Sequence, residues 1–114
     1  MPHPTIAYKV LTAEQWTRFQ QDGQFTGAPV DLADGYIHLS TAEQVDETVA
    51  KHFAGQSGLV IAAVNLAALG DAVRWEPSRG GALFPHIHAT LPLSALIVHA
   101  PLEWLDGEGV RLPE

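Results

Sequence analysis

The chain has 114 residues, of which 46% are hydrophobic, and it carries no cysteine and a formal net charge of −7 with only six Lys and Arg. This length predicts a single domain, residues 1–114, with a core that needs no disulfides. The composition excludes thiolate zinc sites and argues against binding to the backbone of nucleic acids. No apolar run is long enough to cross a bilayer and no signal-peptide pattern is visible, so we expect a cytoplasmic protein without a membrane partner.

The N-terminal third predicts a strand, a helix and a loop. Residues 5–10 form a short apolar run that indicates a strand. Thr12 and Gln15 have the spacing of a capping box, which predicts a helix that ends near Gly23. Residues 24–35 are rich in Gly, Pro and Asp, a composition typical of loops and turns.

A second strand and a second helix follow. Residues 36–39 predict a short strand, and the Ser-x-x-Glu pattern of residues 40–43 predicts the start of a helix. Val45, Val49 and Phe53 recur at helical spacing, so one face of this helix is expected to be buried.

The second half of the chain is dominated by predicted strands. Residues 59–64 are an unbroken apolar run, which is typical of a strand buried on both faces. A helical turn at residues 65–70, a strand at 72–76, a loop at 77–81 and another buried strand at 96–99 complete the prediction. The order indicates an α+β fold with two main helices.

Residues 74–88 hold two arginines, a carboxylate, two histidines and a Gly-Gly pair within fifteen positions. Strand alternation places Arg74 and Glu76 on one face and Trp75 on the other. The simplest interpretation is a surface ion pair between Arg74 and Glu76 with Trp75 in the core. The alternative is that this segment, with Arg79 and its neighbouring glycines, forms the wall of a binding pocket.

Three histidines are candidates for chemistry. His38 precedes a predicted helix start, where it either meets an anion or makes structural hydrogen bonds. His86 and His88 would share one face of a strand. With Glu76 they could ligate a metal, but this spacing is a weak signal and we assign no metal ligands. No motif of serine hydrolases, P-loop proteins or dinucleotide-binding folds is present.

Three segments resemble a known family: residues 35–44 (GYIHLSTAEQ), 74–81 (RWEPSRGG) and 83–86 (LFPH). They are similar to the bacterial family called domain of unknown function 952, over nearly the whole chain. The resemblance implies a fold similar to the ADP-ribosyltransferases, a split and strongly bent mixed sheet with two main helices and a cleft for NAD. The branch that looks closest is the RNA 2′-phosphotransferase type, whose second strand motif is similar to residues 37–40.

The resemblance also implies roles for particular residues. His38 and Ser40 lie in the second strand motif, and Lys9 occupies the position at which the transferases have their first histidine. A lysine there binds oxygens as a point charge and does not reproduce the geometry of imidazole. The candidate catalytic residues are His38, His86 and Glu76. The residues implied to bind a cofactor or ligand are Lys9, Ser40, Trp75, Arg79 and Phe84.

Two functions remain open from the sequence. One is a small enzyme that acts on NAD, ADP-ribose or a phosphorylated ribose, in which His86 or Glu76 moves a proton and Trp75 or Phe84 stacks on a ring. The other is a non-catalytic module on the same fold that binds a nucleotide-like molecule or a protein. The sequence predicts neither the substrate nor the oligomeric state.

Overall fold

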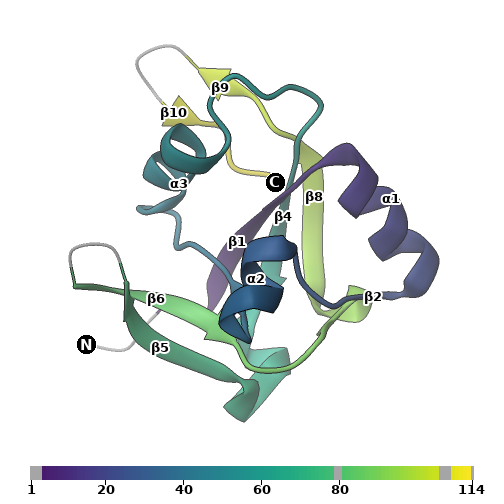
Figure 1. The fold of residues 1–114 in the computed structure, drawn as a ribbon, viewed down its shortest axis with the longest axis vertical. Helices are drawn as coiled ribbons and strands as arrows, with labels where there is room; N and C mark the ends of the chain where they lie inside the picture. The colour runs from purple at the N-terminus through teal and green to yellow at the C-terminus, as the bar shows by residue number, and fades with distance from the viewer. Residues whose placement is uncertain (1–3, 79–80, 106–108, 114) are drawn as a thin grey trace.

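Two three-stranded antiparallel sheets form the framework of the computed structural model, which describes residues 4–78, 81–105 and 109–113. The first sheet has the order β1 (Ile6–Leu11), β4 (Val60–Asn65), β8 (Leu96–Pro101). The second has the order β3 (Ile37–His38), β6 (Ala82–Ile87), β5 (Val73–Ser78). Helices pack around both sheets (Figure 1), so the α+β prediction is confirmed.

The first sheet follows the apolar pattern of the sequence. β4 is its central strand, and residues 61–64 are buried, as an apolar run covered on both faces should be. β8 lies at the edge, and Ile97 and His99 on it are exposed. The prediction of a strand at 96–99 is therefore confirmed, but the prediction that it is buried is wrong, because β8 is an edge strand whose residues alternate between partly buried and exposed.

Helix α1 (Ala13–Asp22) begins at the predicted capping box. The Gln15 backbone N–H donates to Thr12 Oγ1 at 3.1 Å, and the Thr12 N–H donates to Gln15 Oε1 at 3.0 Å. Phe19 points into the core, and Gly23 ends the helix with a φ of 73° that a residue with a Cβ rarely adopts. This part of the sequence prediction is confirmed in detail.

The predicted loop at residues 24–35 is wrong, since it contains strand β2 (Gln24–Phe25) and helix α2 (Pro29–Asp34). The sequence carries ordinary signals for this short helix, with proline in its first turn and Gly35 at its C-terminal cap. The helix is only six residues long, so it lacks the apolar repeat by which helices are usually predicted.

Helix α3 (Val45–His52) begins later than the sequence predicts. The expected box at residues 40–43 is wrong, because the backbone of Ser40 pairs with Tyr8 of β1 and is not free to start a helix. Gln44 instead caps the turn, and its side-chain oxygen accepts from the Thr41 N–H at 3.0 Å. The predicted apolar face is confirmed, with Val45 and Val49 buried.

Strand β6 is absent from the sequence prediction. Its Pro85 has no N–H to donate to a neighbouring strand, which argues against a central strand. The position is tolerated because β3 is only two residues long and pairs with His86 and Ile87 alone. The Pro85 carbonyl still accepts from the Leu39 N–H at 3.1 Å.

The remaining elements are short. The expected helical turn appears as η1 (Leu66–Ala72), and the chain then continues directly into β5, which extends to residue 78 and so shortens the predicted loop. The other elements are β7 (Leu91–Pro92), η2 (Leu93–Ala95), β9 (Trp104–Leu105) and β10 (Gly109–Val110). No helix within the described ranges is long and apolar enough to cross a membrane.

The two large sheets are joined by a bridge between Tyr8 of β1 and Ser40, which lies two residues after the end of β3. The Tyr8 N–H donates to the Ser40 carbonyl at 2.7 Å, and the Ser40 N–H donates to the Tyr8 carbonyl at 2.9 Å. In Figure 1, α2 lies in front of the sheets, α3 at the upper left and β5–β6 at the lower left. This arrangement brings β1, α2, β3, α3 and β6 around one cleft.

Candidate functional site

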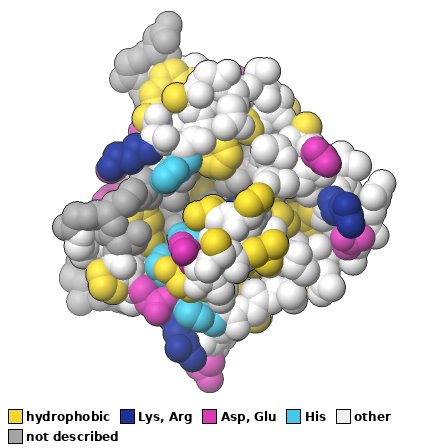
Figure 2. Space-filling view, viewed as in Figure 1, with side chains coloured by type: hydrophobic (Ala, Val, Ile, Leu, Met, Phe, Trp, Pro, Cys, Tyr) yellow, Lys and Arg dark blue, Asp and Glu magenta, His cyan; other side chains and the backbone are white. Residues whose placement is uncertain are grey.

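A cleft of about 500 Å³ lies where the two sheets and the helices α2 and α3 meet. His38 and His86 line it, together with the acidic side chain of Asp34. Figure 2 shows histidine and acidic side chains gathered beside the hollow next to α2. Ligand sites are commonly concave and carry a few convergent polar groups on a mainly apolar lining. This cleft is therefore the candidate functional site.

His38 is held by two carboxylates of the short helix α2. Its Nδ1 lies 2.7 Å from Asp31 Oδ1, and its backbone N–H donates to the same oxygen at 3.1 Å. Its Nε2 lies 3.0 Å from Asp34 Oδ2. Because both ring nitrogens face carboxylates, the orientation of this ring is fixed from both sides.

Asp31 is the buried centre of this group, with a side chain only 1% exposed. Its Oδ2 accepts from the Ala28 N–H at 2.7 Å and from Lys9 Nζ at 3.0 Å. Burial pushes the pKa of Asp31 up, but the Lys9 charge and the hydrogen bonds from His38 and Ala28 outweigh it, so the pKa is lowered. Asp31 is therefore ionised near neutral pH.

Lys9 is directed at Asp31 and away from open solvent. Its Nζ also donates to the His38 carbonyl at 3.0 Å and lies 5.6 Å from the centre of the Phe25 ring. Burial lowers the pKa of Lys9, and the Asp31 charge opposes that shift. The position implied for a ligand-binding cation thus holds a lysine that is bound to other parts of the protein.

His86 is held from the other side of the site, by β5. Its Nδ1 lies 2.8 Å from Glu76 Oε1, and the same oxygen lies 2.7 Å from His88 Nε2. A carboxylate accepts hydrogen bonds, so both rings donate an N–H to Glu76. These two hydrogen bonds, first from His88 and then from His86, lower the pKa of Glu76.

The second nitrogen of His86 has no hydrogen-bond partner in the described part of the chain. His86 is 1% exposed, and its Nε2 is buried without a hydrogen bond among the described residues. Burial lowers the pKa of His86, although Glu76 opposes the shift, so the ring is neutral near pH 7. With Nδ1–H donating to Glu76, Nε2 carries a lone pair. A buried acceptor without a donor costs about 1–3 kcal/mol and calls for an explanation.

Tyr36 packs the histidines together. Its ring is stacked on His86, with centroids 4.2 Å apart and planes 26° apart, and it lies 4.8 Å from the His38 ring. The His38 and His86 rings are themselves 5.2 Å apart in an edge arrangement. Two imidazoles are therefore held side by side at the wall of one cleft.

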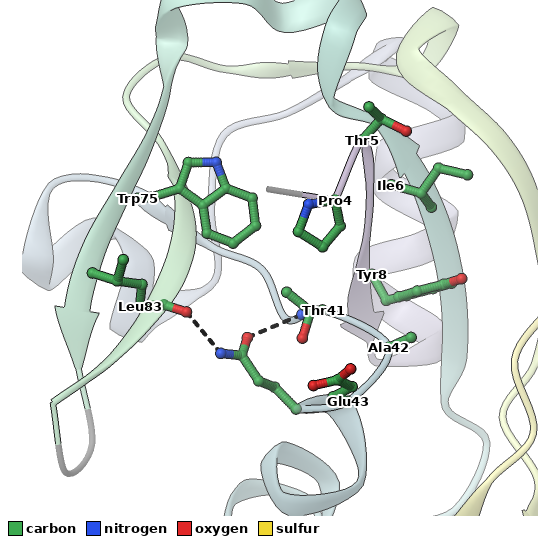
Figure 3. A pocket seen from close by; sticks show the side chains of 10 residues that line it. Pro4, Thr5, Ile6, Tyr8, Thr41, Ala42, Glu43, Trp75 and Leu83 are labelled. Atoms are coloured by element: carbon green, nitrogen blue, oxygen red, sulfur yellow. Dashed lines mark hydrogen bonds between the residues drawn. The ribbon is translucent and has the colours of Figure 1, made fainter. Parts of the chain in front are cut away.

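The other predicted residues divide between two hollows. Ser40 and Phe84 line the histidine cleft. Trp75 lies on the opposite face of β5 and lines a more open hollow of about 770 Å³ (Figure 3). That hollow is larger, but no histidine of the described residues lines it, and its Gln44 already binds the Thr41 N–H and the Leu83 carbonyl. The histidine cleft is the better candidate because His38 and His86 on its wall can exchange protons with a ligand.

Three further expectations concern the β5–β6 region. Glu76 holds His86 and His88 instead of forming the surface pair with Arg74, so the predicted ion pair is wrong. Trp75, which the same interpretation placed in the core, is partly buried and packs against it. Within the ranges that the structure describes, no three His, Asp or Glu side chains are arranged to hold a metal. Arg79, implied as a ligand-binding residue, lies outside the described residues.

Sequence reasoning missed Asp31, Asp34 and Tyr36. The two aspartates lie in the segment predicted to be a loop, so nothing indicated that they would face His38. The available signal was the helix-start pattern at Pro29, which places Asp31 at the third helical position, where it caps the Ala28 N–H.

The comparisons with known proteins agree with the resemblance to the domain of unknown function 952 family. The family model described as "Protein of unknown function (DUF952)" matches residues 10–99. The crystal structure of protein CC0527 from Caulobacter crescentus is 47% identical, with a TM-score of 0.85 over 96% of this chain and 94% of that chain. Its solution NMR structure is 48% identical, with a TM-score of 0.79 over 94% and 91%. No curated protein matches the chain.

Proposed function

The chain belongs to the DUF952 family, and we propose that it is an enzyme in which His86 transfers a proton to or from a small ribose-bearing molecule bound in the cleft. The observation that carries the proposal is the buried Nε2 of His86. It has no partner among the described residues, and it belongs to a ring whose other nitrogen is held by Glu76.

The geometry suits general base catalysis. Glu76 fixes the tautomer of His86 and stabilises the charge that appears when Nε2 accepts a proton, as carboxylates do for histidines in many enzymes. His38, 5.2 Å away and held by Asp31, is placed to bind or protonate another atom of the same ligand. Because Nε2 of His86 is covered in the free protein, ligand binding requires a local rearrangement at the cleft.

The class of ligand comes from the family resemblance, which implies NAD, ADP-ribose or a phosphorylated ribose. The arrangement of two sheets joined at Tyr8 and Ser40, with the cleft at the junction, supports an ADP-ribosyltransferase-like split sheet. The cleft volume of about 500 Å³ suits a ligand of nucleoside size. Phe84 on its wall supplies a surface for a planar ring.

Two of the implied residues take indirect roles in this proposal. Lys9 neutralises Asp31 and holds the backbone of His38, so it acts as a positioning residue. Glu76 does not line the cleft and acts through His86. The groups that touch the ligand are then His38, His86, Ser40 and Phe84.

The test combines binding and turnover. Purified protein is titrated with NAD, ADP-ribose and nicotinamide while the imidazole ¹⁵N signals of His38 and His86 are recorded, and products are followed by mass spectrometry. His86→Asn keeps an N–H near the position of Nδ1 but deletes Nε2, so it should bind ligand and lose turnover by roughly 10²–10⁴-fold. His99→Asn, on the outer edge of β8, is the matched control. Turnover that survives His86→Asn contradicts the proposal.

A second candidate function is a non-catalytic binding module on the same fold. The observation that favours it is that both nitrogens of His38 already contact carboxylates and the Lys9 ammonium is already bound. Ligand-induced shifts at His38 and His86 without any product, and with affinity unaffected by His86→Asn, would support the module.

A further inference from the structure

The charges at the histidine end of the cleft cancel one another. Lys9 is the one Lys or Arg among the described residues that line the cleft, and its ammonium is bound to Asp31 and to the His38 carbonyl. Even with a proton on both nitrogens of His38, the two cations are balanced by Asp31 and Asp34. No lysine or arginine of the described lining therefore remains available for an anionic ligand at this end of the cleft.

Asp34 places a negative charge at the opening of this end. Its side chain is 46% exposed, it lines the cleft, and its Oδ2 lies 3.0 Å from His38 Nε2. A ligand that approaches Nε2 of His38 therefore comes close to a carboxylate. A phosphate group would be repelled by it, since like charges a few ångströms apart near a protein surface interact by several kcal/mol before screening.

The buried Nε2 of His86 also disfavours a phosphate group, because of the hydrogen bonds it can make. A neutral ring that donates from Nδ1 offers only a lone pair at Nε2. A phosphate oxygen is itself an acceptor, whereas a hydroxyl or amine can donate to this lone pair. Charge and hydrogen bonding therefore favour the same type of group.

We infer that the histidine end of the cleft takes a hydrogen-bond donor without negative charge, such as a ribose hydroxyl, and that Asp34 is the residue that excludes phosphate from it. This inference rests on the proposed function and deepens it. Any phosphate on the ligand lies outside the contact with His38 and His86, so a nucleoside should bind as well as its monophosphate.

The experiment compares adenosine, adenosine 5′-monophosphate and inorganic phosphate as probes. Affinities come from the ¹⁵N imidazole shifts of His38 and His86 in the wild-type protein and in Asp34→Asn, which keeps the shape and one acceptor oxygen. Asp22→Asn, on α1 and away from the cleft, is the charge-matched control. Asp34→Asn should strengthen binding of the monophosphate relative to adenosine by roughly tenfold, whatever it does to both affinities through His38, and Asp22→Asn should leave this ratio unchanged.

The outcomes separate the two claims. Monophosphate or inorganic phosphate that shifts His86 of the wild-type protein at lower concentration than adenosine overturns the inference and leaves the proposed function standing. An equal change in affinity for adenosine and for its monophosphate in Asp34→Asn overturns it as well, because the effect would not depend on the charge of the ligand. Failure of these probes and of NAD and ADP-ribose to shift either histidine overturns the proposed function and the inference with it.

Discussion

Each of the two histidines of the cleft is held by a carboxylate, but the buried member is the carboxylate in one pair and the histidine in the other. Each has its Nδ1 within 2.8 Å of a carboxylate oxygen, Asp31 for His38 and Glu76 for His86. In the first pair the carboxylate is buried, with 1% of its side chain exposed, and the histidine is 29% exposed. In the second pair the histidine is 2% exposed and the carboxylate 37%.

This difference in burial determines which substitution in each pair lowers the free energy of unfolding most. Asp31 is buried in its ionised form, and Lys9 and three backbone or ring donors stabilise its charge. A buried histidine can stay neutral and needs only one carboxylate to orient it. The Asp31 pair is thus a structural support with a histidine at its edge, whereas the Glu76 pair delivers a neutral base to the cleft wall.

Removing the counter-ion of Asp31 should have the largest effect. Lys9→Met leaves a buried carboxylate without its cation, and we expect the free energy of unfolding to fall by about 3–5 kcal/mol. Urea denaturation followed by circular dichroism measures it. Lys51→Met, which removes an exposed pair with Glu47, is the control and should cost less than about 1 kcal/mol. Equal losses would mean that the Asp31 centre is not held by charge.

Neutralising the two carboxylates should give unequal losses. Asp31→Asn removes the partner of both Lys9 and His38 inside the protein, although burial lets Lys9 release its proton and limits the damage. Glu76→Gln changes a side chain in contact with solvent and keeps an acceptor oxygen for His86. Chemical denaturation should show the larger loss for Asp31→Asn. The reverse order would contradict the comparison of the two pairs.

The sequence predicted much of the fold and one part of the site. Local signals were sufficient for α1, because its cap, its apolar face and its final glycine agree. They were insufficient for α2, which is too short for periodicity, and for β6, whose Pro85 argues against a central strand. His38 and His86 were identified by their motifs. Asp31 was not, because its role depends on contacts with Lys9 and His38 that no local pattern records.

The pH dependence of stability should separate the pairs into two windows. Burial lowers the pKa of His86 below its ordinary value of 6.5. As the pH falls, the imidazole is therefore protonated at a higher pH in the unfolded chain than in the folded protein. The free energy of unfolding then falls as the pH drops below about 6.5. The pKa of Asp31 is lowered from 3.8, so its contribution is lost only in acid below that value. The free energy of unfolding should be measured between pH 8 and pH 3. The decrease below about pH 6.5 should be absent in His86→Asn, and the decrease in acid below 3.8 should be absent in Asp31→Asn.

The smallest expected effect concerns His88, which shares one oxygen of Glu76 with His86. The charge of His88 contributes to the lowered pKa of His86, after the larger effect of burial. The groups that face His86 are Glu76 on β5, His38 on β3, the stacked Tyr36 and His88 itself.

Two His88 variants separate the charge from the hydrogen bond. His88→Ala removes the charge and leaves Glu76 to His86 alone, so the pKa of His86 should rise in a ¹⁵N NMR titration. His88→Gln supplies an uncharged donor to the same oxygen and should raise it less, because Glu76 stays shared. If His88→Ala leaves the pKa of His86 unchanged, then Glu76 serves each ring independently, and His88 is a structural neighbour without influence on the proposed base.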